Sequence, residues 1–452
     1  MNINLLVKSK GRKKLILTPE SERSEVKEPI YRKAETVWSR LLFLTIIAIC
    51  SALIFYIFVI VFSNWGVVIS MLMAIPLLYA LLKLFLSLFY RPYCDELDTI
   101  QKVSVVIPSF NESPESISNC IHSILAQEYK VHEIIFIDDG SSKSEGFKKS
   151  EEIANYVNNN PAITTKMITH QFKKNQGKRE AQKWAFQRAT GDFVMIIDSD
   201  SYFFKSTIKE MMKPFVKEDI WGVTGHVRAR NKNQNILTMY QDALYDRAFY
   251  VGRGAQSLSG DVLVCSGALS VFRKHFILDN IEDFTLTTFG KKNSIGDDRR
   301  LTNMAHSGGG RIVYQATAQC LTDVPSSPKK FLKQQTRWSK SFFIESIRAY
   351  RFAWKRPIFL FWLTCELVLW VYFLITLLFH LETFMDYFSW NFLLYQTLYV
   401  IMIGFICNAY YARQNFLSFC LSPIYIIIHA LWLIPVRIFA LCTLNNTKWG
   451  TR

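Results

Sequence analysis

Two carboxylates, Asp198 and Asp200, stand one residue apart directly after the apolar run Phe193–Ile197. That run is typical of a buried strand, and open α/β sheets bind ligands at the C-terminal edge of such strands. Two neighbouring carboxylates repel each other unless a cation lies between them, and a hard divalent cation can hold a diphosphate at the same time. The pair therefore predicts a metal and diphosphate site, although a lone Asp-x-Asp is more often a solvated loop.

Two more short apolar runs, Val103–Pro108 and Glu133–Asp138, alternate with helix-like segments. This alternation predicts parallel βαβ units, in which all strands end at the same edge of one sheet. Asp139 follows the second of these runs directly. We therefore expect the carboxylates of Asp138 and Asp139 to lie in the same cleft as those of Asp198 and Asp200.

Lys178 and Arg179 follow Gly177 at the start of a predicted helix. A helix N-terminus offers free backbone N–H groups, and two cations beside it would suit a diphosphate and the edge of a base. Taken alone, the motif is equally compatible with an ordinary helix start that carries solvated basic residues.

The chain has 452 residues, of which 50% are apolar and 15% aromatic, and the apolar residues are concentrated at its two ends. Several long stretches match or exceed the roughly 20 residues that span a bilayer. Two lie near the N-terminus, joined by only three residues, and therefore predict a hairpin of membrane helices. We predict an integral membrane protein with a polar block between two groups of spans. The apolar stretches are Leu41–Phe62, Gly66–Tyr90, Ile358–Phe379, Tyr387–Tyr411 and Phe416–Leu444.

The net charge of +16 would suit a nucleic-acid binder, but no basic reading module is visible in the sequence. Residues 1–40 carry ten Lys and Arg against five acidic residues and precede the first apolar stretch. The positive-inside rule explains that excess and predicts a cytoplasmic N-terminus. Nine cysteines without Cys-x-x-Cys spacing agree with a reducing compartment.

Four further motifs follow in order: Cys265–Ala268, Gly296–Arg299 (Gly-Asp-Asp-Arg), Gln334–Trp338 (Gln-Gln-Thr-Arg-Trp) and Trp449–Arg452 (Trp-Gly-Thr-Arg). With these motifs the chain resembles the processive family 2 glycosyltransferases from Leu41 to its end. Within that family it is most similar to the bacterial, streptococcal-type hyaluronan synthases.

The resemblance implies an α/β domain of the GT-A type, Rossmann-like and cytoplasmic, embedded in an α-helical transmembrane protein. It implies an inverting enzyme that polymerises hyaluronan from UDP-N-acetylglucosamine and UDP-glucuronate and extrudes the growing chain across the plasma membrane. Membrane lipids would be further partners, and nucleic acid would not. A synthase of another β-linked polysaccharide, chitin-like or a glucose–glucuronate capsule, is the main alternative, and a non-catalytic scaffold that binds nucleotide sugars is another.

Inverting transfer to a hydroxyl needs one carboxylate base and no enzyme nucleophile. By the resemblance that base is Asp298, while Asp297 either positions it or caps the following helix. The same resemblance assigns Mg²⁺ or Mn²⁺ to Asp200, with Asp198 alongside, and assigns the leaving UDP to Arg337.

The remaining site residues are also implied by the resemblance. The residues expected to bind UDP are Asp139, Lys178, Arg179, Asp198, Gln334, Arg337, Trp449, Thr451 and Arg452. The residues expected to contact the acceptor sugar are Cys265, Ser266 and Trp338.

The segment Pro328–Tyr350 alternates basic and apolar residues at helical spacing, which predicts an amphipathic helix on the cytoplasmic membrane face. Two charged residues, Lys83 and Glu366, fall inside apolar stretches, where charge is costly. They either pair with each other or line the polymer path, and Lys83 could instead extend to the membrane interface.

The chain is thereby divided into six parts. These are a basic cytoplasmic tail (1–40), a transmembrane hairpin (41–90), a glycosyltransferase domain (91–327), an interfacial helix (328–357), C-terminal transmembrane helices (358–444) and a cytoplasmic tail (445–452).

Overall fold

The computed structural model describes residues 37–285, 287, 295–386 and 390–445. Within these residues, one mixed sheet of eight strands forms the centre of the polar region, in the order β3-β2-β1-β4-β7-β6-β8-β5. The strands are β1 (Val103–Ser109), β2 (Glu133–Asp138), β3 (Lys166–Gln171), β4 (Phe193–Ile196), β5 (Tyr202–Phe203), β6 (Ile220–Ala229), β7 (Ser270–Arg273) and β8 (Arg311–Thr322).

The half of the sheet formed by β3, β2, β1 and β4 is parallel, which confirms the prediction from alternating strands and helices. β1 and β2 are buried at every position, because Val, Ile and Phe face both sides of the sheet. β3 was not predicted from the sequence. This edge strand is polar and mostly accessible, with only Met167 buried, so it lacks the apolar run by which the other strands were found.

The other half of the sheet was not predicted. β7 is antiparallel to both β4 and β6, while β6 and β8 run parallel, and β5 is antiparallel to β8. β4 therefore has a parallel neighbour on one side and an antiparallel neighbour on the other. The turn that carries Asp198 and Asp200 follows β4, so it lies at the position where the strand direction changes.

Helices cover the sheet and connect its strands. α3 begins after Ser113, whose hydroxyl accepts the N–H of Ser116 at 3.1 Å. The helices of the polar region are α3 (Pro114–Leu125), α4 (Glu145–Asn159), α5 (Lys178–Arg188), α6 (Thr207–Met212), η1 (Lys213–Val216), α7 (Ile236–Asp246), η2 (Arg247–Arg253), α8 (Gly254–Ser257), α9 (His275–Asp279), α10 (Ile281–Phe284), α11 (Asp297–Ser307) and α12 (Pro328–Ala353).

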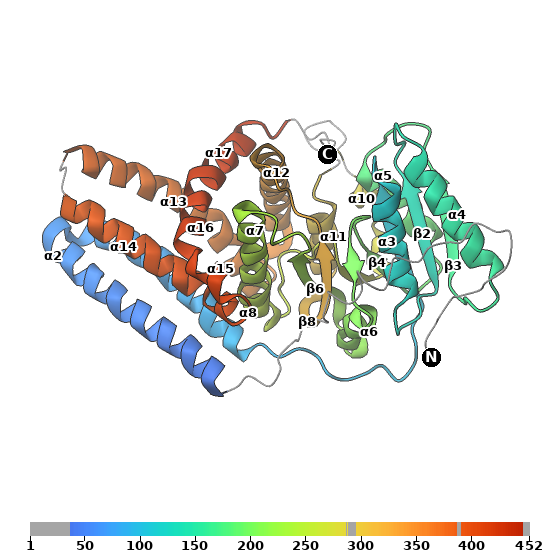
Figure 1. Cartoon of the computed structure of the whole chain (residues 1–452), viewed down its shortest axis with the longest axis horizontal. Coiled ribbons are helices and arrows are strands. Elements are labelled where there is room, and N and C mark those ends of the chain that lie inside the picture. Colours follow the sequence, from blue (N-terminus) through green and yellow to red (C-terminus); the bar gives the residue numbers. More distant parts are fainter. Residues whose placement is uncertain (1–36, 286, 288–294, 387–389, 446–452) are drawn as a thin grey trace.

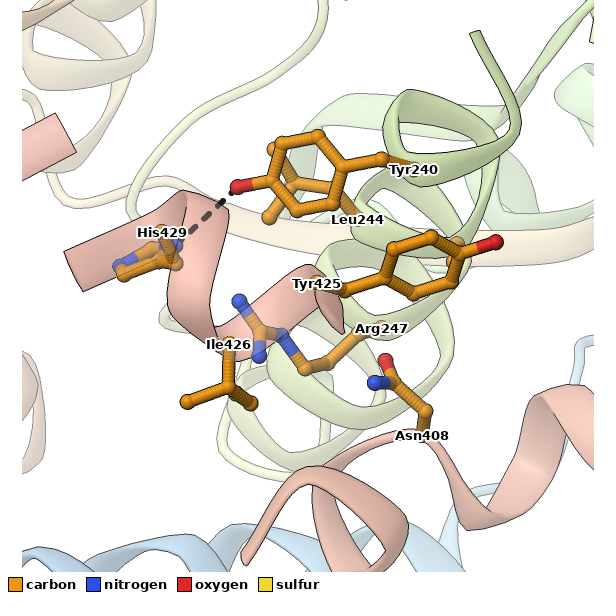
Figure 2. A pocket seen from close by; sticks show the side chains of 8 residues that line it. Tyr240, Leu244, Arg247, Asn408, Tyr425, Ile426 and His429 are labelled. Carbon is orange, nitrogen blue, oxygen red and sulfur yellow. Dashed lines mark hydrogen bonds between the residues drawn. The ribbon is translucent and has the colours of Figure 1, made fainter. Parts of the chain in front are cut away.

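The apolar helices gather at one end of the molecule, away from the parallel half of the sheet (Figure 1). α2 (Val37–Phe89) folds back on itself at Gly66, where φ is +86°, and so forms the predicted hairpin. The C-terminal helices are α13 (Pro357–Asp386), α14 (Trp390–Cys407), η3 (Ala409–Arg413), α15 (Phe416–Cys420), α16 (Ser422–Ile428), η4 (His429–Leu433) and α17 (Ile434–Cys442).

Three helical stretches among the described residues are long and apolar enough to cross a membrane. Two are the halves of α2, Thr45–Asn64 and Gly66–Phe89, and the third runs from Ser422 to Cys442 through α16, η4 and α17. Pro423 stands in the first turn of α16, where a missing N–H costs little, whereas Pro435 is the second residue of α17, which follows the π-helix η4 without a break. The stretch is thus helical throughout and has the length of one span.

α7 and α12 lie between the sheet and the apolar helices (Figure 1). α12 confirms the predicted helix from Pro328, and it packs against α11 on one side and α17 on the other. An ion pair fixes α7 to the sheet, because Arg228 of β6 contacts Asp242 at 2.7 Å. The hydroxyl of Tyr411 in η3 donates to the same carboxylate at 2.6 Å. One buried carboxylate thus joins the sheet, α7 and the C-terminal helices.

Lys83 of α2 and Glu366 of α13 form an ion pair, one of the alternatives left open by the sequence. Tyr79, one turn before Lys83, donates its hydroxyl to the same carboxylate at 3.1 Å. Each charge thereby has a partner within the apolar helices.

We expect single replacements at this pair to destabilise the protein more than the double replacement. Lys83→Met or Glu366→Leu leaves one charge without its partner at membrane depth, which costs about 3 kcal/mol. The double variant removes both charges, and an apolar replacement of a buried pair is often neutral. Thermal unfolding of the three variants in nanodiscs measures this, and a double variant no more stable than the worse single one would contradict it.

Candidate active site

Asp198 and Asp200 lie in a tight turn at the end of β4, where the N–H of Ser201 donates to the carbonyl of Asp198 at 3.0 Å. Asp200 is 9% exposed, whereas about a third of the Asp198 side chain is accessible. The structure therefore brings both carboxylates to the C-terminal edge of the sheet, where the sequence predicts them.

Lys178, the first residue of α5, lies between two carboxylates from distant parts of the chain. Its ammonium is 2.8 Å from Asp198 Oδ1 and 3.0 Å from Asp297 Oδ2. Burial opposes the charged form, but these two carboxylates raise the pKa of Lys178 above its ordinary value. The Asp198–Asp200 turn and the Gly-Asp-Asp-Arg motif are thus parts of one site.

Asp297 is held by two side chains of α5. Besides Lys178, the amide of Gln182 donates to Asp297 Oδ2 at 2.8 Å, and these two residues are one helical turn apart. Burial raises the pKa of Asp297, but Lys178 and Gln182 hold it below its ordinary value. The alternative role of Asp297 as a helix cap does not apply, since Gly296 occupies the N-cap of α11 and no side chain caps it.

The pKa of Asp298 is raised, whereas that of its neighbour Asp297 is lowered. Burial, and then the negative charge of Asp297, raise the pKa of Asp298 to about 6. Its carboxylate accepts the N–H of Arg299 at 2.7 Å, which fixes its direction relative to the first turn of α11. A carboxylate with a pKa near 6 is ionised at neutral pH and is still basic enough to accept a proton.

The first turn of α11 lies directly against α12. A Cβ atom on Gly296 would come within 2.0 Å of the hydroxyl of Ser341, so a side chain does not fit there. The backbone of Gly296 is also left-handed, with φ at +72°, which favours glycine. α12 carries the Gln-Gln-Thr-Arg-Trp motif, and this contact places that motif close to the Asp297–Asp298 pair.

Within that motif, Gln334 has a buried side-chain oxygen without a hydrogen-bond partner among the described residues. Trp338 is 40% exposed, and its ring centre lies 6.2 Å from that of Tyr245 on α7. Arg337, on the same helix, is partly buried. An accessible indole suits the C–H face of a sugar ring, as predicted for the acceptor.

The segment Cys265–Gly267, just before β7, lies against the Lys178 bridge, by which we mean the two contacts of the Lys178 ammonium with Asp198 and Asp297. A Cβ atom on Gly267 would be 3.5 Å from the Lys178 ammonium and 3.6 Å from Asp198 Oδ2. Cys265 is fully buried, and burial raises the pKa of its thiol to about 12, whereas Ser266 is partly exposed. Of the two predicted acceptor contacts in this segment, Ser266 is therefore the more accessible.

Two predicted nucleotide ligands have other partners. Asp139 accepts the N–H groups of Gln176 and Gly177 at 2.8 and 2.9 Å, so these backbone groups are not available for a diphosphate. Burial raises the pKa of Asp139 to about 6 although these N–H groups oppose the shift. Arg179 is 1% exposed, and its guanidinium pairs with Glu345 at 3.0 Å. The guanidinium thus already has protein partners, and nucleotide binding by Arg179 stays a prediction.

Three predicted ligands at the C-terminus, Trp449, Thr451 and Arg452, lie outside the described residues. Two residues of the site were missed by sequence reasoning. Gln182 could have been found from its four-residue spacing to Lys178, which places both on one face of α5. Glu345 gave no such signal, because it belongs to no recognisable motif.

Comparisons with known proteins agree with these observations. Residues 101–341 match a family model described as glycosyltransferase like family 2. A hyaluronan synthase of Streptococcus pyogenes is 43% identical over 379 residues, which cover 83% of this chain and 88% of that protein. The hyaluronan synthase of S. pyogenes serotype M3 is 41% identical over 430 residues, which cover 94% of this chain and 98% of that protein. Human hyaluronan synthase 2 is 30% identical over 414 residues, covering 82% of this chain and 73% of that protein.

Among solved structures, the chain is similar to the mannosyltransferase PcManGT from Pyrobaculum calidifontis, in complex with GDP-Man and Mn²⁺. The TM-score is 0.53 at 18% sequence identity, and the match covers 86% of this chain and 99% of that chain. This likeness confirms the predicted GT-A type of fold.

The raised pKa of Asp298 predicts the pH dependence of turnover. A base works only when ionised, so the rate should fall as the pH drops through about 6. Because the charge of Asp297 raises that pKa, Asp297→Asn should move the acid limb of the profile to lower pH. Initial rates from pH 5 to 8 measure this, and an unchanged or upward-shifted limb would exclude Asp298 as the titrating base.

Proposed function

Since the chain belongs to the family 2 glycosyltransferases and, within them, to the hyaluronan synthases, we propose that it polymerises hyaluronan from UDP-N-acetylglucosamine and UDP-glucuronate. The observation that carries this proposal is the Lys178 bridge, which holds the Asp198–Asp200 turn beside the Asp297–Asp298 pair. In-line transfer from a UDP-sugar needs a diphosphate site and a base in one cleft.

Asp298 is the proposed general base. Its raised pKa and its fixed direction at the first turn of α11 suit removal of a proton from the acceptor hydroxyl. The hydroxyl oxygen then attacks the anomeric carbon and UDP leaves from the opposite face, which inverts the configuration there. Asp297 stays ionised beside Lys178, and its charge keeps Asp298 basic.

Asp198 and Asp200 are the proposed holders of a divalent cation. Two carboxylates on one turn offer the hard oxygen donors that Mg²⁺ and Mn²⁺ prefer. No group of three or more His, Cys, Asp or Glu residues forms a metal site within the described part of the chain. Two protein carboxylates therefore fit a cation that takes its other ligands from the diphosphate and water. When bound, the cation would neutralise charge on the departing UDP.

The motif on α12 is proposed to serve the leaving group and the acceptor. Arg337 would bind the diphosphate of the departing UDP by charge-assisted hydrogen bonds. The unpaired oxygen of Gln334 is an acceptor for a donor group of the nucleotide or sugar. Trp338 would stack on the acceptor sugar. For Trp449–Arg452, the proposed nucleotide contact rests on the sequence motif alone.

The apolar helices are proposed to span the plasma membrane several times, with the catalytic domain cytoplasmic and lipids against α12. α12 and α7 lie between the active site and these helices (Figure 1). A chain that grows at Asp298 would then enter the spans directly, where Lys83 and Glu366 supply polar groups. Extrusion of the polymer would follow from its elongation at this position.

We expect polymer only when both UDP-N-acetylglucosamine and UDP-glucuronate are supplied, because hyaluronan alternates the two sugars. Radiolabelled incorporation with each donor alone and with both measures this, and hyaluronidase should digest the product. Robust polymer from a single donor would instead indicate a chitin-like homopolymer synthase, and polymer from UDP-glucose with UDP-glucuronate would indicate a capsule of those sugars.

Replacement of the proposed base and replacement of the proposed metal ligand should have different effects on UDP binding. Asp298→Asn should lower elongation by about 10²–10⁴-fold, with UDP affinity changed by less than about tenfold, or ~1.4 kcal/mol. Asp200→Asn should weaken both UDP binding and turnover, and EDTA should reproduce it in the wild-type enzyme. Calorimetric UDP binding beside sugar incorporation measures both. Full activity in EDTA would refute the metal site, and lost UDP binding in Asp298→Asn would refute the base.

A further inference from the structure

Arg179 connects three segments of the chain through one buried guanidinium. It donates to the main-chain oxygens of Ile295 at 2.7 Å, Gly296 at 2.9 Å and Phe284 at 3.2 Å. It also pairs with the carboxylate of Glu345 on α12 at 3.0 Å. A planar guanidinium presents several donors in a fixed geometry, so it can hold these acceptors in one arrangement.

Two of these acceptors immediately precede the candidate base. The carbonyls of Ile295 and Gly296 come directly before Asp297 and Asp298, and no side chain caps the start of α11. Asp298 takes its direction from the N–H of the next residue in that first turn. A shift of Gly296 would therefore turn the Asp298 carboxylate with it.

Glu345 extends the same connection to α12. It is 1% exposed, and its carboxylate also forms an ion pair with Arg348 at 2.9 Å. Its main-chain oxygen accepts a hydrogen bond from the side-chain amide of Asn303 on α11. α12 also carries Arg337, the proposed ligand of the leaving group. The Arg179–Glu345 pair therefore fixes α11 relative to α12, and with it the base relative to the leaving-group residues.

We propose that Arg179 is a positioning residue for the general base: through Gly296 and Glu345 it holds the first turn of α11 against α12, so that Asp298 faces the acceptor hydroxyl while Arg337 faces the departing UDP. This inference rests on the proposed role of Asp298. It replaces the earlier prediction that Arg179 binds the nucleotide.

The chain offers a matched control at the other end of α11. Arg356 donates to the main-chain oxygens of Gly310 at 2.7 Å and His306 at 3.4 Å, and it pairs with Asp261 at 2.9 Å. It therefore makes the same kinds of contact as Arg179, to main-chain carbonyls and one carboxylate, with two carbonyls where Arg179 has three. Its loss would weaken the packing of α11 without touching the first turn.

The test compares Arg179→Met, Arg179→Lys and Arg356→Met in the full-length enzyme in nanodiscs. Calorimetry gives the Kd for UDP, release of UDP gives kcat and KM, and thermal unfolding gives Tm. In Arg179→Met, we expect kcat to fall by about 100-fold or more, since alignment of the base is lost. The Kd for UDP should stay within about threefold. Arg179→Lys should recover about tenfold of kcat, because the ammonium keeps the charge and some of the donors.

Arg356→Met should lower Tm while kcat stays within about threefold of wild type, because the first turn of α11 keeps its anchor. If instead it loses as much kcat as Arg179→Met, Arg179 has only a general structural role and the proposal fails. A Kd for UDP that rises in step with the loss of kcat would restore Arg179 as a nucleotide ligand. Should Arg179→Met not fold, Glu345→Gln must show the same separation of kcat from Kd.

The failure of this inference can be told from failure of the proposed function. UDP release is measured with whichever donor or donor pair the wild-type enzyme uses. The ratio of the variant's kcat to the wild-type kcat is therefore the same whether or not the polymer is hyaluronan. Asp298→Asn in the same assay reports on the base itself. Normal turnover in Asp298→Asn would show that Asp298 is not the base. If Asp298→Asn is slow but Arg179→Met turns over normally, only the positioning role of Arg179 is overturned.

Discussion

The ammonium of Lys178 lies between Asp198 and Asp297, and the chemistry of the site depends on that position. Without a cation, these two partly buried carboxylates would repel each other. With it, the turn that would hold the diphosphate and the helix that would hold the base are one hydrogen-bond length from the same atom. Because Asp297 takes this cation, its neighbour Asp298 keeps the higher pKa, and two adjacent identical side chains acquire different pKa values.

The sequence predicted the parts of this fold that have a strong local signal. β1, β2 and β4 are apolar runs with polar turns after them, and α12 has a regular spacing of basic and apolar residues. The hairpin of α2 follows from two apolar stretches and a short connection. The same signal placed Asp198 and Asp200 at the C-terminal edge of the sheet, because that edge is fixed once the strands are parallel.

Other features depend on contacts between distant segments, which no local pattern encodes. β3 is a polar edge strand, and the mixed half of the sheet, with β7, β6, β8 and β5, is paired through residues far apart in sequence. Lys178 and Arg179 are adjacent and both basic, so sequence reasoning gave them one role. In the structure, successive residues of α5 point in different directions, and only Lys178 reaches Asp198.

The shared carboxylate of Asp242 limits how this enzyme can be divided. Arg228 of the sheet and Tyr411 of the C-terminal helices both contact its Oδ2 atom, and the carboxylate is fully buried. A catalytic domain separated from the apolar helices would leave this carboxylate and guanidinium partly exposed and short of a donor, beside the apolar faces of α7 and α12. The sheet domain and the C-terminal helices thus depend on each other to satisfy the same buried polar groups.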